Sequence, residues 1–370
     1  MFSNSLKVAR IFGINVEIDM TWLIVFMILS YSLATNYFPS ALPGAGETMW
    51  WVLGVSATLL LFASVLVHEF AHSLVAIKEG HTIKRITLFI FGGVAHLEEE
   101  PRTSIAELKI TIVGPLSSLG LALLFWLIYL VVPQATPVAA ATFFLASINL
   151  TISLVNLVPA FPLDGGRVLR ALIWYFKKDL LTATRVSVMA GSAFAFLLMG
   201  IGFYTILTIS IMGLWYIFLG WLLYQAGQNS YTQVTLKNSL SGYRVKDLMT
   251  DQVVVVSTEL NIRELVNEFY RYKVGAFPVV GGSALAGMVT MNQVRNVDRR
   301  QWDQYKVRDV MTPIDACIKM HPEDEAADAM MEMAKKNAGR ILVMEEGKLV
   351  GILSNTDVMR LIRMRTALGE

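Results

Sequence analysis

The stretch that decides this fold is His68-Glu69-Phe70-Ala71-His72, an H-E-x-x-H pattern within the almost entirely apolar run 50–77. On a helix, residues four positions apart share a face, so both imidazoles can bind one zinc ion while Glu69 reaches a water there. Ionisable residues are costly in a transmembrane segment unless they face a cavity and a partner. The pattern therefore predicts a zinc site in a membrane-spanning helix rather than a chance group of buried histidines.

Composition supports a membrane protein. Hydrophobic residues are 55% of the 370-residue chain, charged residues are 16%, and the mean hydropathy is +0.53. Soluble globular domains do not reach these values. The net charge of +2 is too small to favour nucleic acid as a partner. The single cysteine, Cys317, excludes an intrachain disulfide and a thiolate zinc site.

About six apolar segments are long enough to cross a bilayer, which takes about 20 residues each. They are residues 20–38, 50–77, 109–132, 137–159, 186–207 and 209–226. Residues 1–19 lack the apolar core and cleavage site of a signal peptide, so the first segment is expected to be retained. Between the second and third segments, residues 83–95 alternate and then run apolar around Gly92-Gly93, which favours a hairpin at the membrane surface.

Basic residues gather beside particular segment ends, and such loops lie in the cytoplasm. The three groups are Lys7 and Arg10; Lys78, Lys84, Arg85 and Arg102; and Arg167, Arg170, Lys177, Lys178 and Arg185. We therefore expect both termini to be cytoplasmic in the cell membrane of a prokaryote. His68 then lies toward the cytoplasmic end of its helix, where water can reach it.

A catalytic zinc site needs a third protein ligand. His81 and His96 are candidates, although both lie in a polar connection and surface positions suit them equally. The better candidate is Asp164, in the sequence Asn156-Leu157-Val158-Pro159-Ala160-Phe161-Pro162-Leu163-Asp164-Gly165-Gly166-Arg167. The prolines and glycines predict unwound backbone that is buried or lines a cavity. Taken alone, the same segment is also a helix stop with a capping aspartate.

H-E-F-A-H in the second segment and N-L-V-P-A-F-P-L-D-G-G after the fourth together resemble the site-2 protease family of intramembrane zinc metalloproteases. The resemblance covers about residues 10–225. Phe91-Gly92-Gly93-Val94-Ala95 is similar to the membrane-surface hairpin of that family, and Gly114-Pro115-Leu116 opens the third segment as expected. The expected fold class is a polytopic α-helical membrane protein followed by a soluble α/β module.

The resemblance implies a role for seven residues: binding of one zinc ion by His68, His72 and Asp164, activation of water by Glu69, assistance at the scissile carbonyl by Asn156, and substrate binding by Gly92 and Gly93. It implies cleavage of transmembrane segments of single-pass or signal-like proteins within the lipid bilayer. A helical substrate must unwind first, and the strand-like segment 82–91 is expected to offer an edge for pairing. A plain amphipathic surface loop is the alternative for that segment.

After Ala226 the chain becomes polar until about Gly242, and the remainder holds an internal repeat. Val245-Lys246-Asp247-Leu248-Met249-Thr250 returns as Val307-Arg308-Asp309-Val310-Met311-Thr312. Each copy reads strand, helix, strand, strand, helix over about 60 residues. This resembles a tandem pair of CBS domains. The expected domains are 1–226 for the protease, 227–243 for a polar linker, and 244–303 and 304–370 for the repeats.

In the CBS family, a Ser or Thr with an Asp three residues later holds a nucleotide ribose. Ser354 and Asp357 match this pattern, whereas Gln293 replaces the aspartate in the first copy. The resemblance implies one site for ATP, ADP or AMP and a homodimer through the pair; a dimerising module without ligand is the alternative. A CBS-regulated metal-ion transporter or channel is the rival function, but a carrier does not need a general base such as Glu69 beside its ligands.

Overall fold

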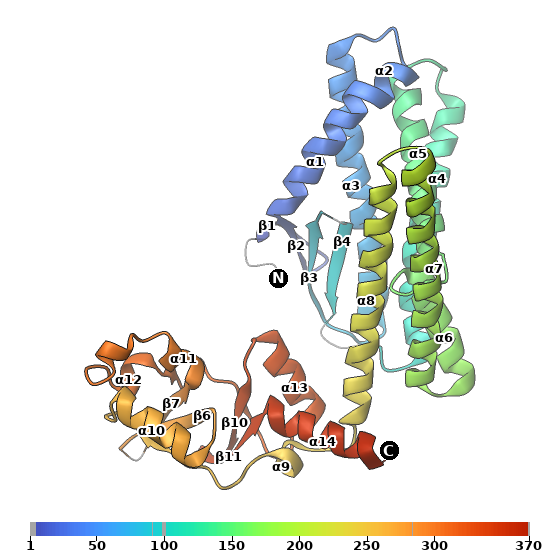
Figure 1. Ribbon diagram of the computed structural model, residues 1–370. Helices are drawn as coiled ribbons and strands as arrows, with labels where there is room; N and C mark the ends of the chain where they lie inside the picture. The colour runs from blue at the N-terminus through green and yellow to red at the C-terminus, as the bar shows by residue number, and fades with distance from the viewer. Residues whose placement is uncertain (1–4, 91, 98–100, 283, 369–370) are drawn as a thin grey trace. The chain divides into compact units, whose positions relative to one another are not determined.

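The computed structural model describes residues 5–90, 92–97, 101–282 and 284–368, and it divides into two compact units, Met1–Val234 and Thr235–Glu370 (Figure 1). The division falls within helix α8 (Gly213–Ser239). The segment 227–243, expected to be a polar linker, is therefore helical as far as Ser239.

The first unit is built from long helices. They are α1 (Met20–Ser32), continued by the π-helical turn η1 (Leu33–Tyr37) and α2 (Phe38–Ala41), then α3 (Glu47–Lys78), α4 (Ser104–Val131), α5 (Pro137–Asn156), α6 (Asp164–Lys177), α7 (Leu180–Thr208) and α8. Helix α4 begins earlier than expected because the Thr103 side chain accepts a hydrogen bond from Ala106 N and caps it. Helix α6 was not expected as a separate element.

Five segments of the described chain are long and apolar enough to span a membrane: Met20–Ala41, Glu47–Lys78, Ser104–Val131, Pro137–Asn156 and Leu180–Thr208. Helix α8, which contains residues 213–226 of the expected sixth span, is not among them because polar residues follow from Gln225 onward. The expected count of six is thus not confirmed.

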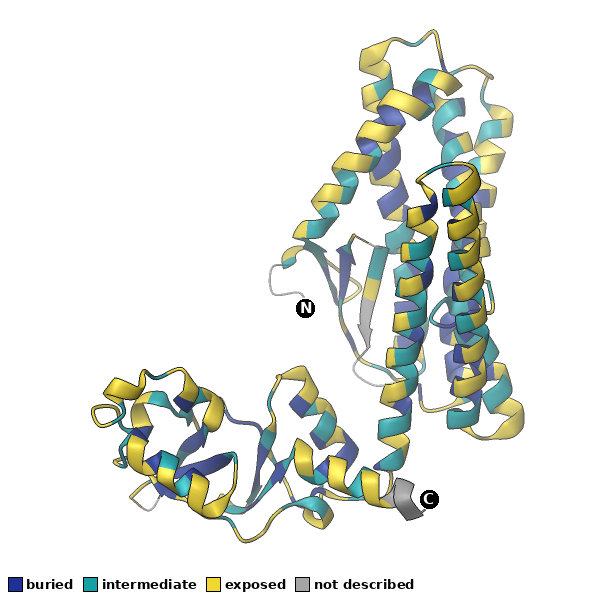
Figure 2. Cartoon of the chain, viewed as in Figure 1, coloured by how far each residue is buried: buried dark blue, intermediate teal, exposed yellow. Residues whose placement is uncertain are grey.

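The outward faces of these helices are apolar. Figure 2 shows buried residues along the sides that face neighbouring helices and exposed residues on the outer sides. Large apolar side chains are exposed there, among them Leu123, Leu127, Phe196, Leu197, Phe203 and Leu207. A helix in water would carry polar residues on its outer face, so the outer surface of the first unit is suited to contact with lipid.

A four-stranded sheet accompanies the helices of the first unit. Its strands are β1 (Ser5–Ile11), β2 (Ile14–Asp19), β3 (Ile83–Phe89) and β4 (Gly92–Leu97), in the order β1-β2-β3-β4. The pair β2–β3 is parallel and the other two pairs are antiparallel. The hairpin expected around Gly92-Gly93 is therefore present as β3–β4, although Phe91 lies outside the described residues.

The position of the free edge differs from the expectation. Strand β3 has β2 on one side and β4 on the other, so residues 83–89 of the expected segment offer no edge; the edge strands of the described sheet are β1 and β4. The reason is that residues 5–11 and 14–19 form two strands, and the second of them covers one side of β3. The apolar side of the sheet packs on the C-terminal part of α3, where Ile14, Ile83 and Ile86 form a buried cluster with Phe70.

The second unit contains both repeats. The first includes α9 (Val245–Leu248), β5 (Val256–Ser257), α10 (Ile262–Tyr272), β6 (Ala276–Gly281), β7 (Ala284–Thr290), α11 (Met291–Arg295) and the 3-10 turn η2 (Arg299–Gln301). The second includes α12 (Val307–Val310), β8 (Thr312–Pro313), β9 (Lys319–Met320), α13 (Ala326–Lys335), β10 (Arg340–Glu345), β11 (Lys348–Ser354) and α14 (Asn355–Leu368). The expected order of strand, helix, strand, strand, helix is present in each copy.

The two repeats exchange their first segments. Val245, which opens the first repeat, is buried in the core of the second, and Val307, which opens the second, is buried in the core of the first. Strand β8 accordingly pairs with β7, and Thr250 bridges to Ile352. Because each core needs residues from both copies, the module folds as one body rather than as two adjacent domains.

Candidate metal centre

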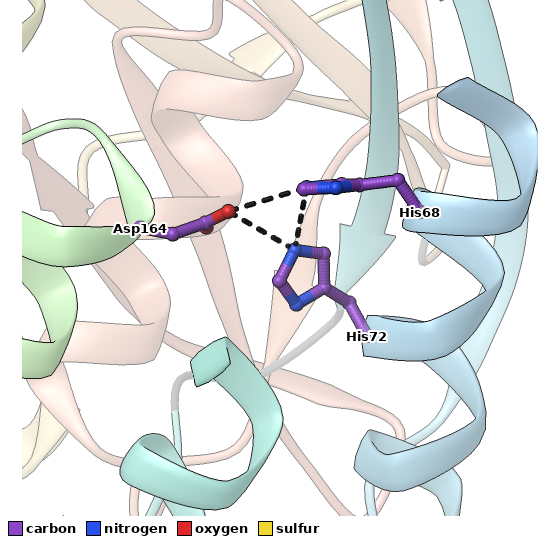
Figure 3. Close-up of side chains that lie close together, drawn as sticks. All are labelled: His68, His72 and Asp164. Atoms are coloured by element: carbon purple, nitrogen blue, oxygen red, sulfur yellow. Dashed lines mark hydrogen bonds and ion pairs between the residues drawn. The ribbon is translucent and has the colours of Figure 1, made fainter. Parts of the chain in front are cut away.

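Three side chains from two helices converge on one point in the first unit. His68 and His72 lie one turn apart on α3, and Asp164 is the first residue of α6 (Figure 3). The Nε2 atoms of the two histidines are 3.1 Å apart, and Asp164 Oδ2 lies 3.2 Å and 3.3 Å from them. Tetrahedral zinc with bonds of about 2.0–2.1 Å separates its ligand atoms by about 3.3 Å. The donor set and its spacing therefore fit a zinc ion.

The remaining nitrogen of each imidazole has its own partner on α4. His72 Nδ1 donates to the carbonyl of Ile110 at 2.6 Å. A carbonyl oxygen only accepts, so this bond places the proton on Nδ1 and leaves the Nε2 lone pair for a metal. His68 Nδ1 lies 2.9 Å from Ser118 Oγ. These contacts orient both rings, and neither Ile110 nor Ser118 was singled out from the sequence.

Gly114 explains how α4 approaches the rings so closely. A Cβ atom at this position would lie 2.1 Å from His72 Nε2 and 2.7 Å from His68 Nε2, so a larger residue would displace the ligands. Ile110, Gly114 and Ser118 are spaced by four residues and so share one face of the helix. Gly114 of the Gly114-Pro115-Leu116 motif thus allows α4 to lie against the histidine rings.

The glycines after Asp164 have a similar role. The segment 157–163 folds back on the first turn of α6, where a Cβ atom at Gly165 would lie 2.3 Å from Leu157 O and one at Gly166 would lie 2.1 Å from Phe161 N. Asp164 was expected within the unwound segment. It is instead the first helical residue, because the amides of Gly166 and Arg167 donate to Leu163 O and start the helix there.

Glu69 is half-buried on α3 beside the hairpin. A Cβ atom at Gly93 would lie 2.5 Å from Glu69 Cγ, so the backbone of β4 runs directly against this side chain. Gly92 has no such neighbour, but its φ of +125° requires glycine at the turn between β3 and β4. The structure thus brings Gly93 to the candidate base and leaves Gly92 with a conformational role.

The other candidates lie apart from this cluster. Among the described residues, His68, His72 and Asp164 form the only group of three or more potential ligands from His, Cys, Asp and Glu. His81 follows the end of α3 and does not join the group, and the side chain of His96 lies outside the described part. Asn156 is the half-buried last residue of α5, with no hydrogen bond to the cluster in the described structure.

In the second unit, Ser354 and Asp357 bond to each other. Asp357 Oδ2 accepts from Ser354 N at 3.1 Å and from Ser354 Oγ at 2.5 Å, and Ser354 Oγ accepts from Asp357 N at 3.3 Å. This reciprocal pattern caps the start of α14. In the first repeat, Gln293 Oε1 accepts from Thr290 N at 2.7 Å, and its amide donates to Thr312 at 2.6 Å.

Arg340 makes the second repeat differ further from the first. Its guanidinium reaches Gly275 of the first repeat, where a Cβ atom would lie 2.5 Å from Nη2. Partial burial lowers the pKa of Arg340, and the negative charge of Asp357 opposes that change. A positive group therefore lies between the repeats, on the side of the Ser354–Asp357 pair.

An H-E-x-x-H pair with a distant aspartate, set among helices that can span a membrane, defines the class of intramembrane metalloproteases. Comparison with known proteins identifies the family. The model of peptidase family M50 matches residues 56–141 and 132–200, and the CBS domain model matches 245–299 and 307–364.

Relatives match over nearly the whole chain. The protein sll0528 of Synechocystis sp. is 31% identical over 379 aligned positions, which cover 99% of this chain and 97% of the relative. Zinc metalloprotease MJ0392 of Methanocaldococcus jannaschii is 30% identical, with 96% and 95% covered. A solved site-2 protease from Methanocaldococcus jannaschii is 27% identical and covers 61% of this chain and 95% of its own, with a TM-score of 0.43. The chain belongs to peptidase family M50 and is a site-2-type metalloendopeptidase with tandem CBS domains.

Proposed function

We propose that this protein cleaves transmembrane segments of membrane proteins, with zinc held by His68, His72 and Asp164. The observation that carries the proposal is the convergence of three ligand atoms within 3.1–3.3 Å of one another from helices far apart in the sequence. Zinc bound there would polarise the scissile carbonyl and lower the pKa of a water to about 7. A metal-ion carrier is disfavoured because the family is enzymatic and Glu69 adjoins the ligands.

Glu69, His72 and Asn156 then have separate roles in the reaction. Glu69 accepts a proton from the attacking water and returns it to the leaving amine. The bond from His72 Nδ1 to Ile110 O keeps the Nε2 lone pair directed at the site. Asn156 donates a hydrogen bond to the oxygen that becomes negative at the scissile carbonyl.

Strand β4 is the proposed docking edge for substrate. A substrate helix must unwind before cleavage because its carbonyls are bonded within the helix. Once extended, it pairs with the outer edge of β4, which has no further strand beside it among the described residues, a recognition mode known as strand addition. Gly92 and Gly93 begin this strand, and Gly93 lies against Glu69, so a paired substrate passes the catalytic carboxylate.

The second unit is the proposed regulatory part. We assign residues 1–226 to catalysis, 227–243 to the connection, and 244–303 and 304–370 to the repeats, with both termini in the cytoplasm of a prokaryotic cell. Ser354 and Asp357 bind the ribose of ATP, ADP or AMP, and Arg340 supplies positive charge nearby. The two repeats together also form the proposed contact between two copies of the chain in a homodimer. A nucleotide can change the rate of proteolysis only to the extent that it binds the active and the inactive conformations of the protein with different affinities.

Metal removal and restoration test the catalytic proposal directly. The full-length protein is purified in detergent, analysed for metal, and incubated with a single-span reporter whose cleavage is followed by mass spectrometry. We expect about one zinc per chain, loss of cleavage with a zinc chelator, and recovery when zinc is restored. Cleavage that persists after complete metal removal would overturn the proposal.

A further inference from the structure

A buried ion pair lies outside the metal cluster. Glu107 in the first turn of α4 is 0% exposed, and the side chain of Arg170 in α6 is 3% exposed. Arg170 Nε donates to Glu107 Oε1 at 2.8 Å, and its Nη2 donates to the same oxygen. Removing two charges from water is expensive, and such pairs are often no more stabilising than apolar residues. Stability alone therefore gives little reason for this pair.

The pair connects the two helices on which the cluster depends. Glu107 lies three residues before Ile110, whose carbonyl orients His72, on the same helix as Gly114. Arg170 lies in the helix that Asp164 begins. A fixed distance between Glu107 and Arg170 is thus a fixed distance between the helix that supports the histidines and the helix that carries the carboxylate.

Arg170 also holds the segment that leads into Asp164. Its guanidinium carbon lies 5.2 Å from the centre of the Phe161 ring, and Phe161 is 6% exposed. The backbone of Phe161 is packed on both sides, against Gly166 of α6 and Gly191 of α7. One side chain therefore contacts α4 and the segment 157–163 at once.

We propose that Glu107 and Arg170 are positioning residues that hold Asp164 at bonding distance from His68 and His72. The inference rests on the proposed zinc role of these three residues. A guanidinium fork fixes both distance and angle to its partners, which a lysine or an apolar residue does not. A ligand displaced by about 0.5 Å no longer fits the metal, so loss of the pair lowers zinc affinity while the helices stay folded.

Zinc affinity and ligand geometry test the proposal in the full-length protein. Affinity is measured by competition with a coloured chelator, and geometry by the visible absorption of bound Co²⁺. For Arg170→Lys, which keeps the charge but loses the fork, we expect about tenfold weaker zinc binding and an altered Co²⁺ spectrum. The double variant Glu107→Leu/Arg170→Met removes both charges, and we expect it to fold but to show the same loss.

Arg167→Gln is the matched control. Arg167 Nε lies 3.7 Å from the same Glu107 oxygen, but its side chain is 26% exposed and makes the weaker contact, so we expect less than a twofold change in zinc affinity. Wild-type affinity and spectrum in Arg170→Lys would overturn the inference, whether or not the double variant folds. Absence of zinc from the wild-type protein would instead overturn the proposed function.

Discussion

The metal cluster and the Ser354–Asp357 pair are both small polar groups that short motifs predict, yet their hydrogen bonding differs. His68 and Asp164 are 96 residues apart in sequence, and the imidazoles have outer partners that leave their Nε2 atoms directed at one point. Ser354 and Asp357 are three residues apart and bond to each other. A helix cap accounts for the hydrogen bonds of the second group, whereas the donor set and spacing of the first fit a zinc ion.

Among the changes that test the metal cluster, the largest loss of activity is expected at Glu69. Glu69→Gln removes the base but no metal ligand, so we expect reporter cleavage to fall by about 10²-fold or more and zinc content to stay at the wild-type value. Glu79→Gln is the control, because Glu79 follows the same helix and pairs with Lys109 on the exposed side. Equal cleavage by Glu69→Gln and the wild type would end the assignment of Glu69 as the base.

Loss of the metal itself is expected from Asp164→Ala. This change removes one of three ligands, and metal analysis after purification should find the site largely empty while the protein still elutes as a folded species. Asp179→Ala is a suitable comparison, since Asp179 caps the start of α7 at the surface and accepts from Leu181 N and Thr182 N. Full zinc content in Asp164→Ala, with loss in His96→Ala, would move the third ligand to the hairpin.

A smaller effect should come from the outer partner of His68. Ser118→Ala removes the contact to His68 Nδ1 without touching a ligand, and we expect zinc affinity to fall about tenfold. The neighbouring Ser117→Ala should change it little, since Ser117 Oγ donates to the Gly114 carbonyl of its own helix. If both variants bind zinc alike, the orientation of the His68 ring does not depend on Ser118.

The contrast also shows why some features could be predicted from sequence and others could not. The histidine pair and the apolar segments follow from periodicity within one element, and Asp164 follows from an unusual Pro/Gly segment. The ion pair of Glu107 and Arg170 has no such local signal, because its meaning depends on which helices are neighbours. By sequence alone, Arg170 is one of several basic residues after the fourth apolar segment, and these charges predict a connection rather than helix α6 with a buried arginine.

The order of the sheet also depends on a contact between distant segments. Strands β1 and β2 precede the first span, and β2 pairs with β3 although helices α1, α2 and α3 lie between these strands in the sequence. A parallel pair between segments so far apart cannot be read from alternation in either one. Because β2 covers one side of β3, the outer edge among the described strands is that of β4, next to Glu69, and this is the edge where we propose that substrate pairs.

The smallest expected effect concerns nucleotide binding by the Ser354–Asp357 pair. If Ser354 and Asp357 do more than cap α14, Asp357→Ala should weaken AMP, ADP or ATP binding by about 1 kcal/mol. This is the net value of one hydrogen bond to the ribose, because on binding that bond replaces a hydrogen bond to water. Gln293→Ala is the matched variant in the first repeat, where the amide is occupied by Thr312, and it should leave binding unchanged. Calorimetry on the full-length protein in detergent measures both. A cap alone predicts lower thermal stability for Asp357→Ala and no nucleotide heat even for the wild type at millimolar concentration, and that result would leave the module as a dimerisation device.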